Sequence, residues 1–131
     1  MSMRSGSSSS GSGGGVVKPI ETWTELRTCL REAKDKLVVL EFMAPWSEPS
    51  KAMEQPYKDV ASEFANENVQ FVALNFDKFE FLGRRLRVEA MPVFLMVRGF
   101  KVEDRIVTLT RDELRNKIRE MLAPKPSSTG G

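Results

Sequence analysis

Histidine is absent from the 131 residues, and cysteine occurs only once, at Cys29. Without imidazole there is no Ser-His or Cys-His nucleophilic pair, no histidine metal ligand and no ordinary general base that titrates near neutral pH. A single cysteine excludes an intrachain disulfide, a Cys-x-x-Cys redox pair and a cysteine-rich zinc site. Most familiar enzyme chemistries are therefore excluded, and we expect neither a metal nor a cofactor.

The chain also lacks long apolar runs and an excess of one charge. No stretch is long enough to span a bilayer, and the amino terminus has no apolar segment typical of a secretory signal. Twenty Lys and Arg against 18 Asp and Glu leave a formal charge of +2, which predicts no strong attraction to nucleic acid or to an anionic membrane. We expect a cytoplasmic monomer that binds neither nucleic acid nor a membrane.

The two ends differ in composition from the middle of the chain. Residues 1–15 are almost wholly Ser and Gly, which cannot bury enough apolar surface to offset the entropy of ordering, so we expect a disordered arm. The Pro- and Ser-rich tail at 123–131 is expected to be disordered for the same reason. The remaining residues, 16–122, are sufficient for one domain with a core.

Hydrophobic periodicity within residues 16–122 predicts alternating strands and helices. Pro19 confines the first strand to an edge of the sheet, and the apolar run at 37–42 is typical of a strand covered on both faces. The predicted order is β-α-β-α-β-α-β-β-α. Its members are a strand opening at Val16, a helix capped by Thr22, a strand at 37–42, a helix from Ser47 kinked at Pro56, a strand at 69–75, a short helix capped by Asp77, a hairpin of 93–97 and 102–107, and a helix capped by Thr110.

Two reactive side chains lie among apolar residues. Cys29 shares the face of the first helix that Trp23, Leu26 and Leu30 are expected to bury, so we expect an inert thiol rather than a reactive or glutathione-binding one. Glu41 interrupts the apolar strand, where a carboxylate should have a raised pKa. A catalytic role is possible for such a group, but no substrate chemistry accompanies it, so we expect its side chain to reach solvent or a local partner.

Four segments together resemble the thioredoxin family. Residues 42–51, Phe-Met-Ala-Pro-Trp-Ser-Glu-Pro-Ser-Lys, resemble its strand-to-helix active-site segment, usually Trp-Cys-Gly-Pro-Cys followed by Lys or Arg. Residues 90–94, Ala-Met-Pro-Val-Phe, resemble the loop whose proline is cis and faces that site. Residues 75–77 and the Gly99 hairpin are the other two segments. The resemblance implies an α/β thioredoxin fold, with a central mixed five-stranded sheet flanked by four helices.

Both redox-cysteine positions implied by this resemblance hold serine, at Ser47 and Ser50. A redox thioredoxin needs a thiolate of lowered pKa at a helix N-terminus and a second thiol that releases the mixed disulfide. A hydroxyl does neither, so Ser47 is expected only to cap the helix. Glu41 stands at the position of the family's buried acid, and Ala73 at that of the nearby lysine. These departures suggest a lineage not held to dithiol chemistry. Among subfamilies the chain most resembles plant h-type thioredoxins, especially their relatives with serine at the second cysteine position. Those relatives also depart from the family at the positions of the acid and the lysine.

The resemblance also implies a groove for an extended peptide, formed by Trp46, Pro49, Met91 and Pro92, with exposed backbone at Met91 to pair with the peptide. The family's glycine near the last strand is Thr108 here, which should narrow or reshape the groove. We therefore predict a redox-inactive thioredoxin-like domain that binds a protein or extended peptide.

Two other functions stay open at this point. The chain could be a plant h-type thiol-disulfide oxidoreductase or disulfide isomerase in a Cys→Ser inactivated form. It could also be regulated by phosphorylation in the Ser-rich arm or at Ser47, where a helix N-terminus would favour the added charge.

Overall fold

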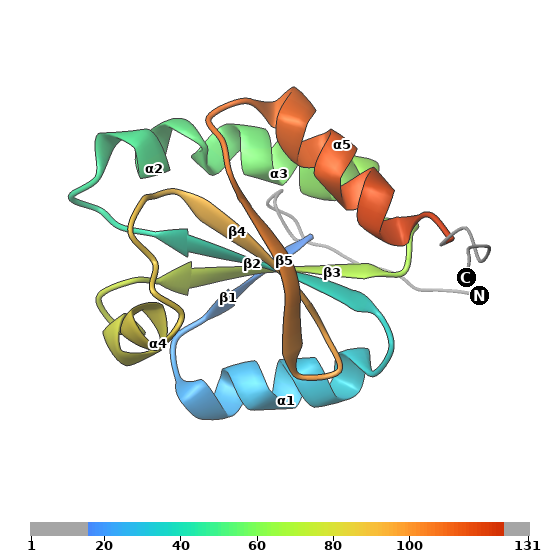
Figure 1. Ribbon diagram of the computed structural model, residues 1–131, viewed down its shortest axis with the longest axis horizontal. Coiled ribbons are helices and arrows are strands. Elements are labelled where there is room, and N and C mark those ends of the chain that lie inside the picture. The colour runs from blue at the N-terminus through green and yellow to red at the C-terminus, as the bar shows by residue number, and fades with distance from the viewer. Residues whose placement is uncertain (1–15, 125–131) are drawn as a thin grey trace.

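Five strands rich in β-branched and aromatic residues form one mixed sheet in the computed structural model, which describes residues 16–124. The arm expected at 1–15, and the expected tail apart from residues 123–124, lie outside the described residues. Strands and helices alternate in the predicted order (Figure 1). Their bounds are β1 Val17–Ile20, α1 Trp23–Ala33, β2 Leu37–Met43, α2 Glu48–Ala52, α3 Glu54–Glu63, β3 Val69–Asn75, α4 Glu80–Arg85, β4 Val93–Arg98, β5 Lys101–Val107 and α5 Arg111–Leu122.

The strand order is β1-β3-β2-β4-β5, so the most apolar strand, β2, lies at the centre. β3 pairs in parallel with both β1 and β2, whereas β4 runs antiparallel to β2 and β5 antiparallel to β4. Pro19 lies on β1 at one edge of the sheet, as predicted, because proline has no N–H to give to a second neighbouring strand.

Helices cover both faces of the sheet. In Figure 1, α1 and α4 lie on one side and α2, α3 and α5 on the other. Successive residues of a strand point to opposite faces, so Leu40 and Phe42 pack with the core beneath α1, and Leu37 and Val39 pack with the core beneath α3 and α5. This double cover explains why β2 is buried along nearly its whole length.

The helix that starts after Ser47 is broken at Met53 into α2 and α3, which confirms the kink predicted at Pro56. A proline inside a helix cannot donate to the carbonyl four residues back, and its ring crowds that carbonyl. The break leaves the predicted stripe of Met53, Tyr57 and Val60 buried. The Tyr57 hydroxyl lies 3.0 Å from the carbonyl oxygen of Val39 and 2.9 Å from that of Val72, which ties α3 to the sheet.

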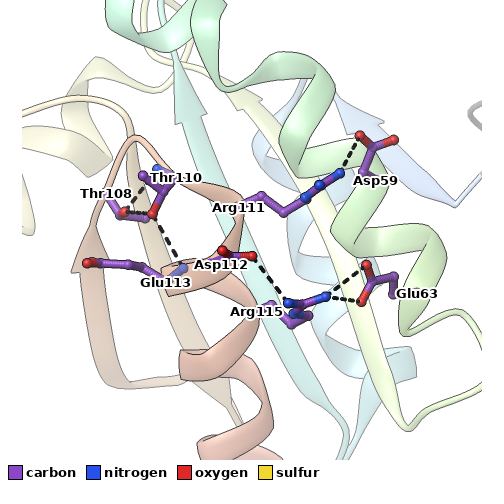
Figure 2. A network of polar contacts seen from close by, with 8 residues as sticks. All are labelled: Asp59, Glu63, Thr108, Thr110, Arg111, Asp112, Glu113 and Arg115. Atoms are coloured by element: carbon purple, nitrogen blue, oxygen red, sulfur yellow. Dashed lines mark hydrogen bonds and ion pairs between the residues drawn. The ribbon is translucent and has the colours of Figure 1, made fainter.

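Helix α5 begins at a network of threonine hydroxyls (Figure 2). The Oγ1 of Thr110 accepts a hydrogen bond from the Glu113 N–H at 3.4 Å, which confirms the predicted cap. The Oγ1 of Thr108 in turn accepts from the Thr110 N–H at 3.1 Å. Arginines of α5 then reach acidic residues of α3 across the surface. These ion pairs are Arg111–Asp59 at 3.3 Å and Arg115–Glu63 at 3.3 Å.

Two details of the helices differ from the sequence prediction. Trp23 is 44% exposed, because it is the first residue of α1 and its ring meets the edge of Phe81 at a centroid distance of 5.8 Å rather than entering the core. Asp77 does not cap α4, whose N-cap position is held by Phe79 without a side-chain hydrogen bond. The Asp77 carboxylate is occupied elsewhere, by the indole of Trp46.

Candidate functional site

The site is built where β2 ends and the chain turns into α2. The Ser47 N–H donates to the Ala44 carbonyl at 3.0 Å, which closes the turn, and Pro49 lies in the first turn of the helix as predicted. Ser50 is fully buried and Ser47 is 9% exposed. Both serines therefore lie at the start of α2, in the strand-to-helix arrangement that the sequence predicts.

Ser47 holds the N-cap position of α2, as predicted, but its side chain makes no cap hydrogen bond, so that part of the prediction is wrong. An N-cap oxygen ordinarily accepts from the N–H groups two or three residues further on. The first of these belongs to Pro49, which has no N–H to donate, and the Ser47 hydroxyl makes no cap hydrogen bond. Only its backbone contributes, because the Ser47 carbonyl accepts from the Lys51 N–H at 3.2 Å.

The second serine lies against the loop that precedes β4. The Ser50 hydroxyl donates to the sulfur of Met91 at 4.0 Å, a weak contact that leaves the hydroxyl without a base to activate it. The Met91–Pro92 peptide bond is cis, as the resemblance implies. No hydrogen bond within residues 16–124 joins Glu41 to either serine, so the three positions that correspond to the family's redox cysteines and buried acid are not linked by hydrogen bonds.

Trp46 is the most exposed of the large hydrophobic side chains within residues 16–124. Its side chain is 64% exposed, its Nε1–H donates to Asp77 Oδ1 at 3.3 Å, and its ring meets the edge of Phe76 at a centroid distance of 6.3 Å. Asn75 holds Asp77 in place, because its Oδ1 accepts from the Asp77 N–H at 2.8 Å. The indole is thus fixed from two sides and still open to a partner.

Sequence reasoning missed Asp77 and Phe76 as supports of Trp46. Residues 75–77 stand out in the sequence only as a segment similar to the family, with no sign of what they touch. The contact crosses 31 residues of chain, a distance at which local periodicity carries no signal. The Phe76 N–H donates to the Met43 carbonyl at 2.8 Å, which places this turn directly beside the end of β2.

Thr108 directly follows Val107, whose register partner on β4 is Val93, the residue after Pro92. It is buried, and its hydroxyl accepts from the Thr110 N–H and lies 3.2 Å from the Thr110 hydroxyl. Its oxygen is therefore engaged as an acceptor at the start of α5. That its side chain narrows the groove stays a prediction.

Glu41 is buried rather than reaching solvent, contrary to the sequence prediction, and one of its two carboxyl oxygens has no hydrogen-bond partner. It is 3% exposed, and its Oε2 atom is buried without a hydrogen-bond partner. Burial raises the pKa of Glu41 from 4.5 to about 8, the Glu54 carboxylate adds to this rise, and the Lys58 ammonium opposes it. Glu41 is buried because α3, which carries Glu54 and Lys58, packs over β2 at this point.

Cys29 is buried in the core beneath α1, as predicted. Burial raises the pKa of its thiol, Lys18 lowers it and Glu32 raises it further. A thiol that is both buried and protonated is a poor nucleophile. Within residues 16–124 no group of cysteine or acidic side chains converges as a metal site requires, and no helix there is long and apolar enough to cross a membrane.

Comparison with known proteins gives one consistent family. A family model described as Thioredoxin matches residues 20–120. Thioredoxin H2-2 of Oryza sativa subsp. japonica is 32% identical over 112 residues, which cover 86% of this chain and 82% of that protein. The crystal structure of a poplar wild-type thioredoxin h is similar with a TM-score of 0.77 at 25% identity, covering 85% of this chain and 100% of that one.

A further structural neighbour comes from the crystal structure of a ferredoxin:thioredoxin reductase and thioredoxin f2 complex. Its TM-score is 0.74 at 23% identity, and the match covers 83% of this chain and 97% of that one. At this identity the similarity supports the fold alone. The expected fold, with its mixed five-stranded sheet and flanking helices, is confirmed if α2 and α3 are counted as one kinked helix.

Proposed function

Because this chain belongs to the thioredoxin family, we propose that it is a member without dithiol chemistry that binds an extended segment of a partner protein beside Trp46, Met91 and Pro92. The observation that carries the proposal is the contrast between the serines and their surroundings. Ser47 and Ser50 offer no thiol, whereas the exposed indole of Trp46 is held by Asp77 and Phe76.

The backbone at Met91 supports binding of an extended peptide. Met91 makes no backbone hydrogen bond with the other described residues, and its side chain is partly exposed. A free N–H and C=O on a fixed loop can pair with a peptide strand, and a neighbouring aromatic side chain can supply apolar contact area. Trp46 and the exposed Pro49 would provide that area here.

The class of partner follows from this geometry. An exposed indole beside backbone without hydrogen bonds to the described residues suits an extended segment of a protein rather than a small molecule. The cytoplasmic location, the monomeric state and the absence of nucleic-acid binding expected from the sequence stay predictions.

A peptide-binding experiment with paired tryptophan variants tests the proposal. Peptides selected by display on the full chain would be titrated by fluorescence anisotropy against wild type, Trp46→Ala and Trp23→Ala. Trp23 is the matched control, because it is also an exposed tryptophan, on α1. An aromatic anchor at an interface contributes about 2 kcal/mol or more, so Trp46→Ala should weaken binding about 30-fold and Trp23→Ala less than twofold. Equal effects of the two changes would contradict binding at the groove.

A thiol-disulfide oxidoreductase or disulfide isomerase in a Cys→Ser inactivated form is the second candidate. The similarity to a thioredoxin h of rice and to another of poplar favours it. The two candidates differ in whether the encoding gene specifies Ser or Cys at position 47, which sequencing of the gene decides. Phosphorylation at Ser47 has less support, because that side chain is 9% exposed, and the Ser-rich arm lies outside the described residues.

A further inference from the structure

A cavity of about 310 Å³ lies between α3 and the edge of the sheet formed by β1, β3 and β2. Val17, Pro19, Met43 and Ala73 give it apolar walls, and Glu41 supplies a carboxyl group. The volume is at the lower end of the range found for small-molecule pockets, about 300–1,000 Å³. None of the residues that form the groove beside Trp46 lines this cavity, so it is a separate feature.

The cavity contains an unsatisfied polar atom. The Oε2 of Glu41 is buried without a hydrogen-bond partner, and the residue is 3% exposed. Ala73 is its register partner on β3, and the short alanine side chain leaves open the space beside the carboxyl. A buried polar atom without a partner destabilises the folded state and is uncommon in folded proteins. This combination of space and an unpaired acceptor indicates a binding site.

The charges around the cavity favour a cation once Glu41 is ionised. Two of its lining residues, Glu41 and Glu54, are acidic and one, Lys58, is basic. Lys58 is already paired with Glu54, at 3.8 Å across one turn of α3. The hydroxyl of Tyr57, which also lines the cavity, is engaged with the backbone of Val39 and Val72 and does not compete for a ligand.

We propose that this cavity binds an alkylammonium group, whose –NH₃⁺ donates to the Glu41 carboxylate while its alkyl chain packs against Val17, Met43 and Ala73. A compact ammonium with an apolar stem matches one buried acceptor surrounded by apolar walls. Pro19, Glu54 and Lys58 are exposed and mark the side from which the ligand enters.

Binding is linked to the release of a proton. Because the pKa of Glu41 is about 8, its carboxyl is mostly protonated at pH 7 and gives one proton to solvent when the ammonium arrives. The other ionisable groups that face it, Glu54, Tyr57 and Lys58, all come from α3, whereas β1 and β3 contribute only Val17, Pro19 and Ala73. Apparent affinity scales with the ionised fraction. It should therefore rise about ninefold from pH 6 to pH 7 and level off near pH 9, below the pKa of about 10.4 at which an alkylammonium itself loses its proton.

The same ammonium chemistry has two sources, a free small amine or a lysine side chain of a partner protein. Both are tested by titrating the full chain, followed by two-dimensional NMR, with n-butylammonium and with N-acetyl-lysine N′-methylamide at pH 6, 7 and 9. Saturable shifts at the amides of Val17 and Ala73 are the expected result. Binding of n-butylammonium alone assigns a small amine, and binding of the blocked lysine assigns a protein side chain.

Neutral and variant controls make the proposal falsifiable. n-Butanol has a similar shape without charge, and Glu41→Gln keeps the side-chain size without an ionisable group; both should reduce affinity at pH 9 at least tenfold. If Glu41→Gln fails to fold, Ala73→Met serves instead. It fills the cavity from the neighbouring strand β3 and should abolish the amide shifts caused by either amine. Equal binding of n-butanol, affinity independent of pH, or no saturable shift with either amine would overturn the proposal and leave the cavity to solvent.

Discussion

Glu41 links the stability of the molecule to pH at the scale of a single residue. Its carboxyl has a pKa of about 8 in the folded chain, against 4.5 for a free glutamate side chain. Between these two values the folded state holds a proton that the unfolded state has lost. The free energy of unfolding must then fall as pH rises through this window, and Glu41 contributes no further change above it.

Wild type should be about 3 kcal/mol less stable at pH 8 than at pH 5.5 through this group, from 1.36 kcal/mol per unit of pKa difference. Glu41→Gln should remove this dependence, because glutamine does not titrate. Urea unfolding of both proteins at the two pH values measures the effect. A wild type with the same slope as Glu41→Gln would show that the carboxyl is ionised and solvated in the folded chain.

Cys29 should react slowly with thiol reagents while the chain is folded. It is 6% exposed, and burial raises its thiol pKa, so the thiolate is scarce and hidden. We expect labelling by 5,5′-dithiobis(2-nitrobenzoate) at pH 8 to be at least 100-fold slower than in 6 M guanidinium chloride. Equally fast labelling in both conditions would mean that the Cys29 thiol is accessible and reactive in the folded chain, which would contradict the prediction of an inert thiol.

Residues whose environment is set by chain-distant contacts were the hardest to predict. The burial of Cys29 follows from its helical face, and the apolar run predicts that β2 is covered. Pattern alone does not show that Pro49 lacks the first of the N–H groups from which the Ser47 hydroxyl would accept. This becomes clear only when each N–H group available to the cap is checked in turn. Nor does it show that Glu41 lacks a partner, because that depends on what α3 and β3 place around it.

At the scale of the elements, α4 controls the position of Trp46 through a glycine. A Cβ added at Gly83 would lie 2.4 Å from Cε1 of Phe76, and the Phe76 ring packs edge-on against both Phe42 and Trp46. Phe76 therefore needs the space that Gly83 leaves. A larger residue in α4 would displace the ring that supports the proposed binding surface.

Gly83→Ala should lower the free energy of unfolding by about 1 kcal/mol, since overpacking costs more than the helix propensity gained. In a Trp23→Phe background it should also shift the fluorescence emission of Trp46. Gly99→Ala is the matched control, because Gly99 has a φ of +61° and no atom near the added Cβ. It should lose comparable stability through backbone strain with unchanged emission. An unshifted Gly83→Ala spectrum would disprove the coupling.

The start of α5 depends on its threonine cap more than on its surface ion pairs. Thr110→Ala removes the acceptor for the Glu113 N–H and should cost about 1 kcal/mol. Arg111→Ala removes the pair with Asp59, whose side chain is 43% exposed, and should cost at most about 0.5 kcal/mol. Thermal unfolding of the two variants measures which change costs more stability. A larger loss of stability for Arg111→Ala than for Thr110→Ala would contradict this prediction.

The order and kind of the elements were predictable from the sequence, and the kink at Pro56 was as well. Apolar residues at a spacing of two or of three to four mark each strand and helix, and these patterns are local. The role of Asp77 was not predictable in this way, since its partner Trp46 lies on another loop. The mixed five-stranded sheet was expected only through the resemblance to a family, and the order of its strands was not predicted, because strand pairing is not encoded in periodicity.

At the scale of the whole molecule, the loops that follow β2 and precede β4 meet at one end of the sheet. Central strands that are neighbours in the sheet bring Ser50 and Met91 together although 41 residues separate them. The fold thus brings the strand-to-helix turn and the cis-proline loop together, while Ser47, Ser50, Glu41, Ala73 and Thr108 differ from the residues that the resemblance to the family implies. The central claim is therefore that this surface binds without redox turnover.

Insulin reduction coupled to thioredoxin reductase tests this claim most directly, with the full chain and the Ser47→Cys/Ser50→Cys double variant assayed side by side. The chain as it stands should give no turnover above background, because neither hydroxyl can form a mixed disulfide. Activity gained by the double variant would show that the site stays competent for thiols and favours the inactivated oxidoreductase. A folded but inactive double variant favours a dedicated binding protein. Turnover by the unaltered chain would contradict the account.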